Sequence, residues 1–212
     1  MDTRQAELTV EAFMGQLASS APTPGGGSAA ALAGAMGAAL VHMVVELTTG
    51  RPAAAPVEDE LRDLALAAAG FQSELLQFVE NDAAAYAAVV AARGLPRETE
   101  RERELRRVQI DAAVRDATRS PLHIAERASE VLALAERLAP IGNRNAISDV
   151  GVAGLLASVA LRGGALNVRI NLPSLPDDDP LRREAGDRVD ALLAGLDDRE
   201  AALRAAVAER LG

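Results

Sequence analysis

The chain has 212 residues, contains no cysteine and carries a formal net charge of −9. Without cysteine the chain cannot form disulfides, bind an iron–sulfur cluster through thiolates or use a cysteine nucleophile. Every basic residue is arginine, so a lysine Schiff base and a lysine-containing phosphate loop are also excluded. The acidic charge and an aromatic content of 2% argue against a nucleic-acid partner. The two histidines, His42 and His123, are too far apart in sequence to indicate a metal site.

The N-terminal residues, MDTRQAELTV, contain no basic region followed by an apolar run. We therefore expect no signal peptide and a cytoplasmic protein. Residues 28–45 are apolar enough to raise the question of a membrane span, but they are mostly alanine and glycine and include His42. A buried helix of a bundle without membrane association is the expected structure.

Capping residues, prolines and glycines divide the first half of the chain into helices. We expect Thr9 to cap a short helix, and the prolines at 22 and 24 to impose an extended segment after it. Ser28 is then expected to cap a long helix that reaches about residue 49. Pro56 predicts the start of the next helix, which ends at Gly94 and is the longest uninterrupted helical pattern in the sequence.

The second half of the chain also reads as helical. Pro96 predicts a charged helix, Pro121 a new helix to about residue 139, and Ser148 the cap of an apolar helix. Asp179 with Pro180 predicts the start of a C-terminal helical region. Polar and apolar residues alternate over residues 167–172, as in a β-strand, but a single short strand would have no other strand to pair with. We predict an all-α fold, a single-domain helical bundle over residues 1–212 with long apolar helices.

Residues 21–40 read APTPGGGSAAALAGAMGAAL, a glycine turn that leads into an apolar helix. The spacing of Gly25, Gly27 and Ala30 matches a dinucleotide-binding motif, but that motif requires a preceding strand, and here a helix and two prolines precede it. Free N–H groups at a helix N-terminus still favour an anionic or carbonyl-bearing ligand. We therefore keep Gly25, Gly26, Gly27 and Ser28 as candidate binding residues, with tight backbone packing as the structural alternative.

A lone carboxylate, Asp82, interrupts an apolar helical stripe at positions 71, 75, 78, 79, 86, 89 and 90. Burying it without a partner would cost several kcal/mol, so it should be paired with arginine, protonated, or placed in a cavity where it acts. Desolvation would raise its pKa toward the range useful for a general acid or base. Asp82 is therefore a candidate catalytic residue, and a structural ion pair is the alternative.

Short polar side chains lie on either side of the apolar helix expected after residue 147, within GNRNAISD (142–149) and NVRINLP (167–173). Their amide and carboxyl groups could bind the edge of a heterocycle, and the arginines could bind its carboxylates. Helix capping is the alternative role. The candidate residues are Asn143, Arg144, Asn145, Asp149, Asn167, Arg169 and Asn171.

The segments PTPGGGSAAALAGAMGAAL, LTTGR, GLPRETERER, SPLHIAE, GNRNAISDVGVAGLL and ALNVRINLPS occur in this order. Over about residues 5 to 180 the sequence resembles the C-terminal family of formiminotransferase-cyclodeaminases. The resemblance implies an all-helical, dimeric fold that binds a tetrahydrofolate derivative, without a metal or any cofactor beyond that substrate. The implied activity is hydrolysis of 5,10-methenyltetrahydrofolate to 10-formyltetrahydrofolate. A formimidoyltetrahydrofolate cyclodeaminase, an inactive folate-binding or interaction protein, and a nucleotide-binding protein remain alternatives.

The resemblance also suggests roles for the candidate residues. Asp82 would be the proton shuttle, and Asp149 its partner or a contact of the pterin ring. The glycine turn and the asparagines would position the ring system. Since folates carry carboxylates and the chain is acidic, nearby arginines should offset the unfavourable field, and Arg51, Arg144 and Arg169 are the candidates.

Overall fold

The computed structural model describes residues 4–212, and every regular element within this range is a helix. The α-helices are α1 (Val10–Leu17), α2 (Gly26–Glu46), α3 (Glu58–Arg93), α4 (Glu100–Leu138), α5 (Ile147–Asn171), α6 (Pro180–Leu193) and α7 (Leu196–Leu211). Short 3-10 helices connect them: η1 (Gln5–Glu7), η2 (Pro52–Val57), η3 (Arg144–Ala146) and η4 (Leu172–Ser174). The prediction of an all-α fold is confirmed.

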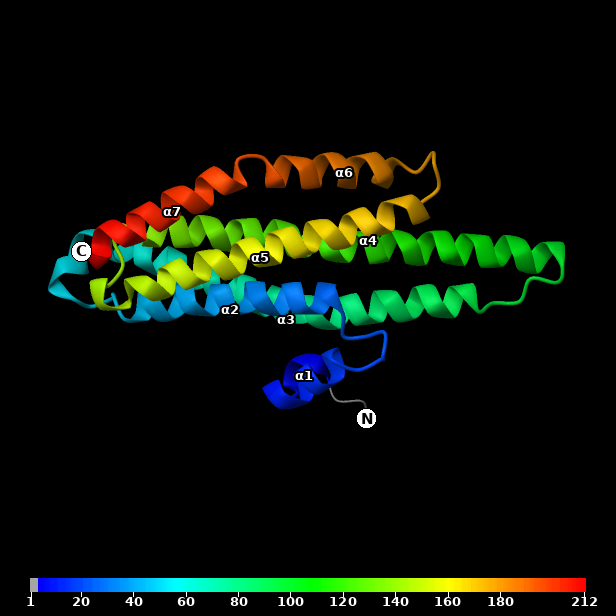
Figure 1. Ribbon diagram of the computed structural model, residues 1–212, viewed down its shortest axis with the longest axis horizontal. Helices are drawn as coiled ribbons and strands as arrows, with labels where there is room; N and C mark the ends of the chain where they lie inside the picture. Colours follow the sequence, from blue (N-terminus) through cyan, green and yellow to red (C-terminus); the bar gives the residue numbers. More distant parts are fainter. Residues whose placement is uncertain (1–3) are drawn as a thin grey trace.

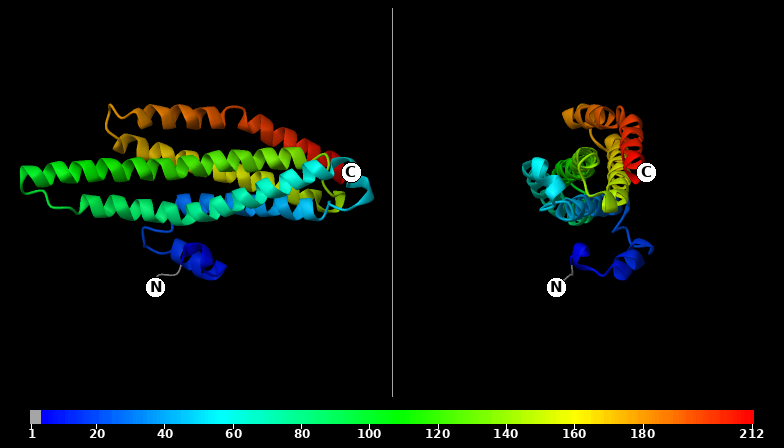
Figure 2. Two further views of the ribbon diagram at one scale, coloured as in Figure 1. Left: turned by 180° about the vertical axis from the view of Figure 1, so that it is seen from behind. Right: turned by 90° about the vertical axis from the view of Figure 1, so that its left-hand side faces the viewer.

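The long helices α2, α3, α4 and α5 form an antiparallel bundle (Figures 1 and 2). Helices α6 and α7 lie along one side of this bundle, and α1 lies outside it. Helices α3 and α4 extend past the N-terminal end of α2, as Figure 1 shows. The main core consists of alanine, valine and leucine side chains contributed by all four long helices.

Glycines allow α2 and α5 to approach closely. A Cβ at Gly34 would lie 3.2 Å from the Cβ of Ala160, and a Cβ at Gly37 would lie 3.0 Å from the carbonyl oxygen of Ala153. Side chains larger than hydrogen would force the helices apart at these points. The same contacts fix the antiparallel register, because residues near the start of α2 face residues near the end of α5.

The predicted cap of α1 is confirmed, whereas the predicted cap of α2 is wrong. Thr9 Oγ1 accepts a hydrogen bond of 3.1 Å from the N–H of Ala12. Helix α2 starts at Gly26, directly after Gly25, and ends at Glu46. The Ser28 hydroxyl therefore lies inside the first turn of α2, where it bonds to α3 instead of capping its own helix.

Two further helix starts differ from the prediction. Helix α4 begins at Glu100 rather than at Pro96, because Thr99 and Glu102 form a reciprocal capping box. Ser148 does not cap α5. The preceding η3 turn is capped by Asn143, whose side-chain oxygen accepts from the N–H of Asn145 at 3.0 Å. Helix α5 follows directly and begins at Ile147, so Ser148 lies within it.

Helix α4 continues through Pro121, so the predicted break is wrong, and α4 with 39 residues is longer than α3 with 36. Proline has no N–H to donate to the carbonyl four residues earlier, which belongs to Ala117. The side-chain amide of Asn171 donates to this carbonyl at 2.8 Å. A neighbouring helix thus replaces the missing hydrogen bond, and the strand-like alternation near Asn171 belongs to the last turns of α5.

The C-terminal region contains two helices. The predicted start at Asp179 and Pro180 is confirmed, and Asp179 is the cap of α6: its Oδ1 accepts from the N–H of Leu181 at 3.0 Å, and its Oδ2 pairs with Arg115 Nε at 2.5 Å. Gly195 separates α6 from α7 with a φ of 70°, a backbone conformation that favours glycine.

Helix α2 and the span Arg144–Ser174 are long and apolar enough to cross a membrane by length and composition alone. Core helices of soluble proteins pass the same test, and 61% and 50% of the respective apolar windows are buried inside the bundle. These helices are therefore weak evidence for a membrane span.

Candidate active site

Asp82 lies on α3 and faces the first turn of α2. Its Oδ2 atom accepts two hydrogen bonds from Ser28, one of 2.9 Å from the backbone N–H and one of 3.0 Å from the hydroxyl. The Ser28 hydroxyl also lies 3.3 Å from the carbonyl oxygen of Val79, one turn earlier on α3. One carboxylate oxygen is thereby fixed, while Oδ1 lies over the glycine turn at Gly27.

Gly27 is the glycine of the turn that the closeness of Asp82 requires. A Cβ at Gly27 would overlap the Asp82 carboxyl group, so any other residue would displace this group from its position beside Ser28. Gly25 has an ordinary extended backbone with φ −127°, so its own dihedrals do not demand glycine. The N–H groups of Gly26 and Gly27 belong to the first helical turn and have no intrahelical acceptor; Gly26 is exposed, whereas Gly27 is buried.

Asn167 is the third element of this site. A Cβ at Gly26 would lie 3.5 Å from Asn167 Nδ2, so the end of α5 faces the start of α2. The amide Nδ2 donates to the Gly163 carbonyl at 2.8 Å, which fixes the orientation of the side chain. Asp82, the glycine turn, Ser28 and Asn167 therefore come together from three helices.

Burial raises the pKa of Asp82, and the two hydrogen bonds from Ser28 oppose this shift without cancelling it. No charged side chain of the described residues contributes to the shift. The structural ion pair, which was the alternative to a catalytic role, is not formed, since no arginine within residues 4–212 bridges to Asp82. A half-buried carboxyl group whose pKa is raised by burial holds a proton more readily than an exposed one, which is the property that a general acid or base requires.

Arg51, Asn143, Arg144 and Asn145 lie at the opposite end of α2. Asn143 donates its N–H to Thr48 Oγ1 at 2.8 Å and its side-chain amide to the Leu47 carbonyl at 3.0 Å. Arg51 donates to Asn143 Oδ1 at 3.2 Å. Since the helix rises about 1.5 Å per residue, this group lies about 30 Å from Ser28. Arg51, Asn143, Arg144 and Asn145 thus form a separate group in the chain.

The remaining candidates do not reach Asp82 either. Asp149 lies in the first turn of α5, and the antiparallel register places that turn beyond the middle of α2, about 20 Å from Ser28. Arg169 is exposed and pairs with Asp190 of α6 at 2.8 Å. The Asn171 amide bonds to α4. Within one chain, only Asn167 of the residues predicted around α5 joins the Asp82 site.

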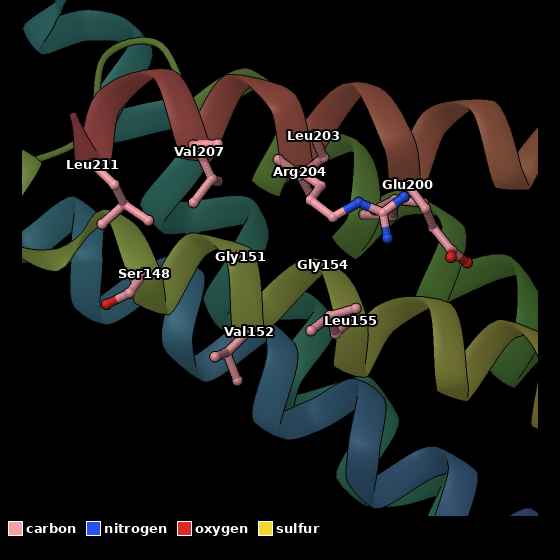
Figure 3. A pocket seen from close by; sticks show the side chains of 12 residues that line it. Ser148, Gly151, Val152, Gly154, Leu155, Glu200, Leu203, Arg204, Val207 and Leu211 are labelled. Carbon is pink, nitrogen blue, oxygen red and sulfur yellow. The ribbon is translucent and has the colours of Figure 1, made fainter.

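An apolar cavity of about 300 Å³ lies between α5 and α7 (Figure 3). Figure 3 shows Val207 and Leu211 projecting from α7 toward α5. Glu200 and Arg204 are the charged residues in its lining, and no group of polar side chains converges on it. It therefore lacks the chemistry of the Asp82 site. Across residues 4–212 there is no group of three or more His, Asp or Glu side chains with metal-binding geometry.

The family model of the formiminotransferase-cyclodeaminase family matches residues 9–190. The methenyltetrahydrofolate cyclohydrolase of Methylorubrum extorquens is 45% identical over 186 residues, which cover 88% of this chain and 89% of that protein. The formimidoyltransferase-cyclodeaminase of Rattus norvegicus is 33% identical over 187 residues, which cover 88% of this chain and 34% of that longer protein.

Among solved structures, the formiminotetrahydrofolate cyclodeaminase of Thermotoga maritima superposes with a TM-score of 0.85. The match covers 97% of this chain and 98% of that one, at 23% sequence identity. At this identity the likeness establishes the shared fold.

Proposed function

The chain belongs to the formiminotransferase-cyclodeaminase family, and we propose that it hydrolyses 5,10-methenyltetrahydrofolate to 10-formyltetrahydrofolate. The observation that carries this proposal is the 45% identity to a methenyltetrahydrofolate cyclohydrolase that matches over nearly the whole of both chains. The activity places the protein in folate one-carbon metabolism. We propose that it acts in the cytoplasm, as the sequence led us to expect.

In the proposed mechanism, Asp82 is the proton shuttle. Its free Oδ1 takes a proton from water as the water oxygen attacks the cationic carbon between N5 and N10. The tetrahedral adduct then collapses: the bond from this carbon to N5 breaks, N5 receives the proton from Asp82, and the adduct hydroxyl loses its proton to solvent as the formyl carbonyl forms on N10. The N–H groups of Gly26 and Gly27 and the amide of Asn167 would position the folate ring.

The charge of the site suits this substrate. The methenyl group is cationic, and Asp82 is a carboxyl group with no charged neighbour acting on its pKa. A carboxylate beside the cationic carbon stabilises its positive charge and activates the attacking water. Attack of water on such a carbon needs a base and no Lewis acid, so we propose that the reaction proceeds without a metal or a further cofactor.

The alternative activity is that of a formimidoyltetrahydrofolate cyclodeaminase, which the 33% identity to the rat protein favours. In that reaction N10 attacks the 5-formimino carbon, and ammonia leaves after it receives a proton. The same carboxyl group could move both protons. A protein that binds folate without turnover is the remaining possibility.

We also propose a homodimer. Helix α5 exposes a stripe of apolar side chains spaced three, four or seven residues apart, with Val159 exposed by 58% and Ile170 by 73%. Met36 and Met43 of α2, the helix packed against α5, are exposed as well. Apolar faces of this kind mark interaction sites. A second copy that covers this face would bury more than about 1,200 Å² in total.

A direct assay tests the activity. Purified protein is mixed with 5,10-methenyltetrahydrofolate while the absorbance of the methenyl chromophore is followed, and in parallel with 5-formiminotetrahydrofolate while ammonia is measured. The proposal predicts an enzyme-dependent loss of methenyl absorbance. Ammonia release with a rise in methenyl absorbance would instead establish the cyclodeaminase, and saturable folate binding without either signal would establish an inactive protein.

A further inference from the structure

A cavity of about 560 Å³ lies where α2 ends and α5 begins, at the end of the bundle that also holds the last turn of α7 (Figure 1). Its lining includes Arg51, Arg144 and Arg210 and no aspartate or glutamate. The chain as a whole has a net charge of −9. The cavity is therefore a local concentration of positive charge on a negatively charged molecule.

Each of these guanidinium groups is held by a neutral acceptor. Arg51 Nη1 donates to Asn143 Oδ1 at 3.2 Å, and Arg144 Nε donates to the Arg210 carbonyl at 2.8 Å. Both terminal nitrogens of Arg210 donate to backbone carbonyls of the turn after α4. These acceptors fix the positions of the three groups and carry no formal charge.

The absence of carboxylate partners distinguishes these arginines from others in the fold. Arg162 pairs with two carboxylates, at 2.6 and 2.9 Å, and Arg199 pairs with Glu136 at 2.8 Å. No acidic side chain of residues 4–212 forms a salt bridge with the three cavity arginines. Arg210 Nε is moreover buried and has no hydrogen-bond partner in the described part of the chain. A buried donor on a cationic group that lacks an acceptor leaves the charge of Arg210 less well solvated than that of an exposed arginine.

We propose that this cavity binds a small polyanion with two or more carboxylate or phosphate groups. We expect at least two negative charges because none of the three arginines forms a salt bridge with an acidic side chain of residues 4–212. Planar guanidinium groups present paired donors that match the oxygens of carboxylates and phosphates. The polyanion accepts hydrogen bonds from the remaining donors of Arg51 and Arg144 and lies in the field of Arg210.

The polyanion site is distinct from the Asp82 site. The two lie at opposite ends of α2, about 30 Å apart. The inference therefore concerns a second ligand and does not rest on the proposed activity.

Isothermal titration calorimetry with citrate and with pyrophosphate tests the proposal at an ionic strength of about 0.15 M, where unspecific attraction is largely screened. We expect saturable binding of at least one probe. Arg51→Gln and Arg144→Gln should each weaken binding about tenfold or more, because each removes a charged hydrogen-bond donor. Citrate as the better probe identifies a polycarboxylate ligand, and pyrophosphate a phosphorylated one.

Arg101→Gln is the matched control, because Arg101 is an exposed arginine at the far end of α4. It should leave binding unchanged. Arg210 is not substituted, because its hydrogen bonds connect α7 to the turn after α4 and its loss would disturb the fold. Absence of saturable binding with both probes, or equal weakening by Arg101→Gln, would overturn the proposal. Asp82→Asn should retain probe binding, so a failure of the folate activity and a failure of this site are separately visible.

Discussion

At the scale of single residues, the Ser28 hydroxyl has one hydrogen and two acceptors. It lies 3.0 Å from Asp82 Oδ2 and 3.3 Å from the Val79 carbonyl. The hydroxyl can donate to Asp82 when the carboxyl group is ionised and turn to Val79 when it is protonated. Ser28 thus supports both protonation states of the proposed shuttle while it keeps Oδ1 directed over the glycine turn.

Ser28→Ala removes a hydrogen bond that favours the ionised carboxylate. The pKa of Asp82, already raised by burial, should rise further, and the limb of the pH–activity profile that requires the base should move to higher pH. Titration of the ¹³C-labelled Asp82 carboxyl by NMR measures the same change without turnover. Ser158→Ala is the control, because the Ser158 hydroxyl is buried without a partner in the described residues. Identical titration of Asp82 in wild type and Ser28→Ala would contradict this role.

The sequence predicted part of the site at this scale. Asp82 was recognisable because it breaks an apolar stripe, and the glycine turn because it precedes a helix. The contact between Asp82 and Ser28 joins residues far apart in sequence. The helical periodicity of the sequence describes neighbours within one helix and cannot predict a contact between two helices. For the same reason, the asparagines around α5 seemed to form one group, although the length of the helix separates them. Nothing in the sequence singled out Arg210.

At the scale of helices, local signals predicted the order of elements and several ends. Thr9 and Asp179 cap their helices, and Gly94 ends α3. The predicted break at Pro121 failed because the compensating donor, Asn171, comes from another helix. Local propensity determined the helix ends only where no tertiary contact overrode it.

This contact gives a prediction for α4. Asn171→Ala leaves the Ala117 carbonyl unsatisfied and should lower the free energy of unfolding by about 1 to 3 kcal/mol. In a Pro121→Ala background, the new backbone N–H can bond to Ala117, so Asn171→Ala should cost much less. Urea unfolding of the four proteins in this double-mutant cycle measures the difference. Equal costs of Asn171→Ala in both backgrounds would show that the amide does not compensate for the proline.

At the scale of the whole molecule, the apolar character of α2 and α5 suggested a dimer from the sequence, and their exposed faces support that proposal. Light scattering at micromolar concentration should give the mass of a dimer. Val159→Glu places a charge on the exposed stripe and should shift the protein toward monomer. Leu66→Glu is the control, because Leu66 is exposed by 70% on α3, away from that stripe. A monomeric wild-type protein, or equal dissociation by both variants, would contradict the proposed interface.

The central claim is that Asp82 works in catalysis rather than in structure, and the two roles predict opposite effects of Asp82→Asn. Because burial raises the pKa of Asp82, its contribution favours folding at low pH and is lost as the pH rises through the raised pKa. Asparagine has the shape of aspartate and keeps an oxygen that accepts from Ser28, but it has no charge to desolvate, so it does not lose this stability as the pH rises. Stability near neutral pH should therefore hold or rise.

The most direct test measures turnover of 5,10-methenyltetrahydrofolate and thermal melting on the same preparations of wild type and Asp82→Asn. The account predicts that turnover falls by about 10²- to 10⁴-fold, while the melting temperature is unchanged or higher. A lowered melting temperature with near-normal activity per folded molecule would contradict it.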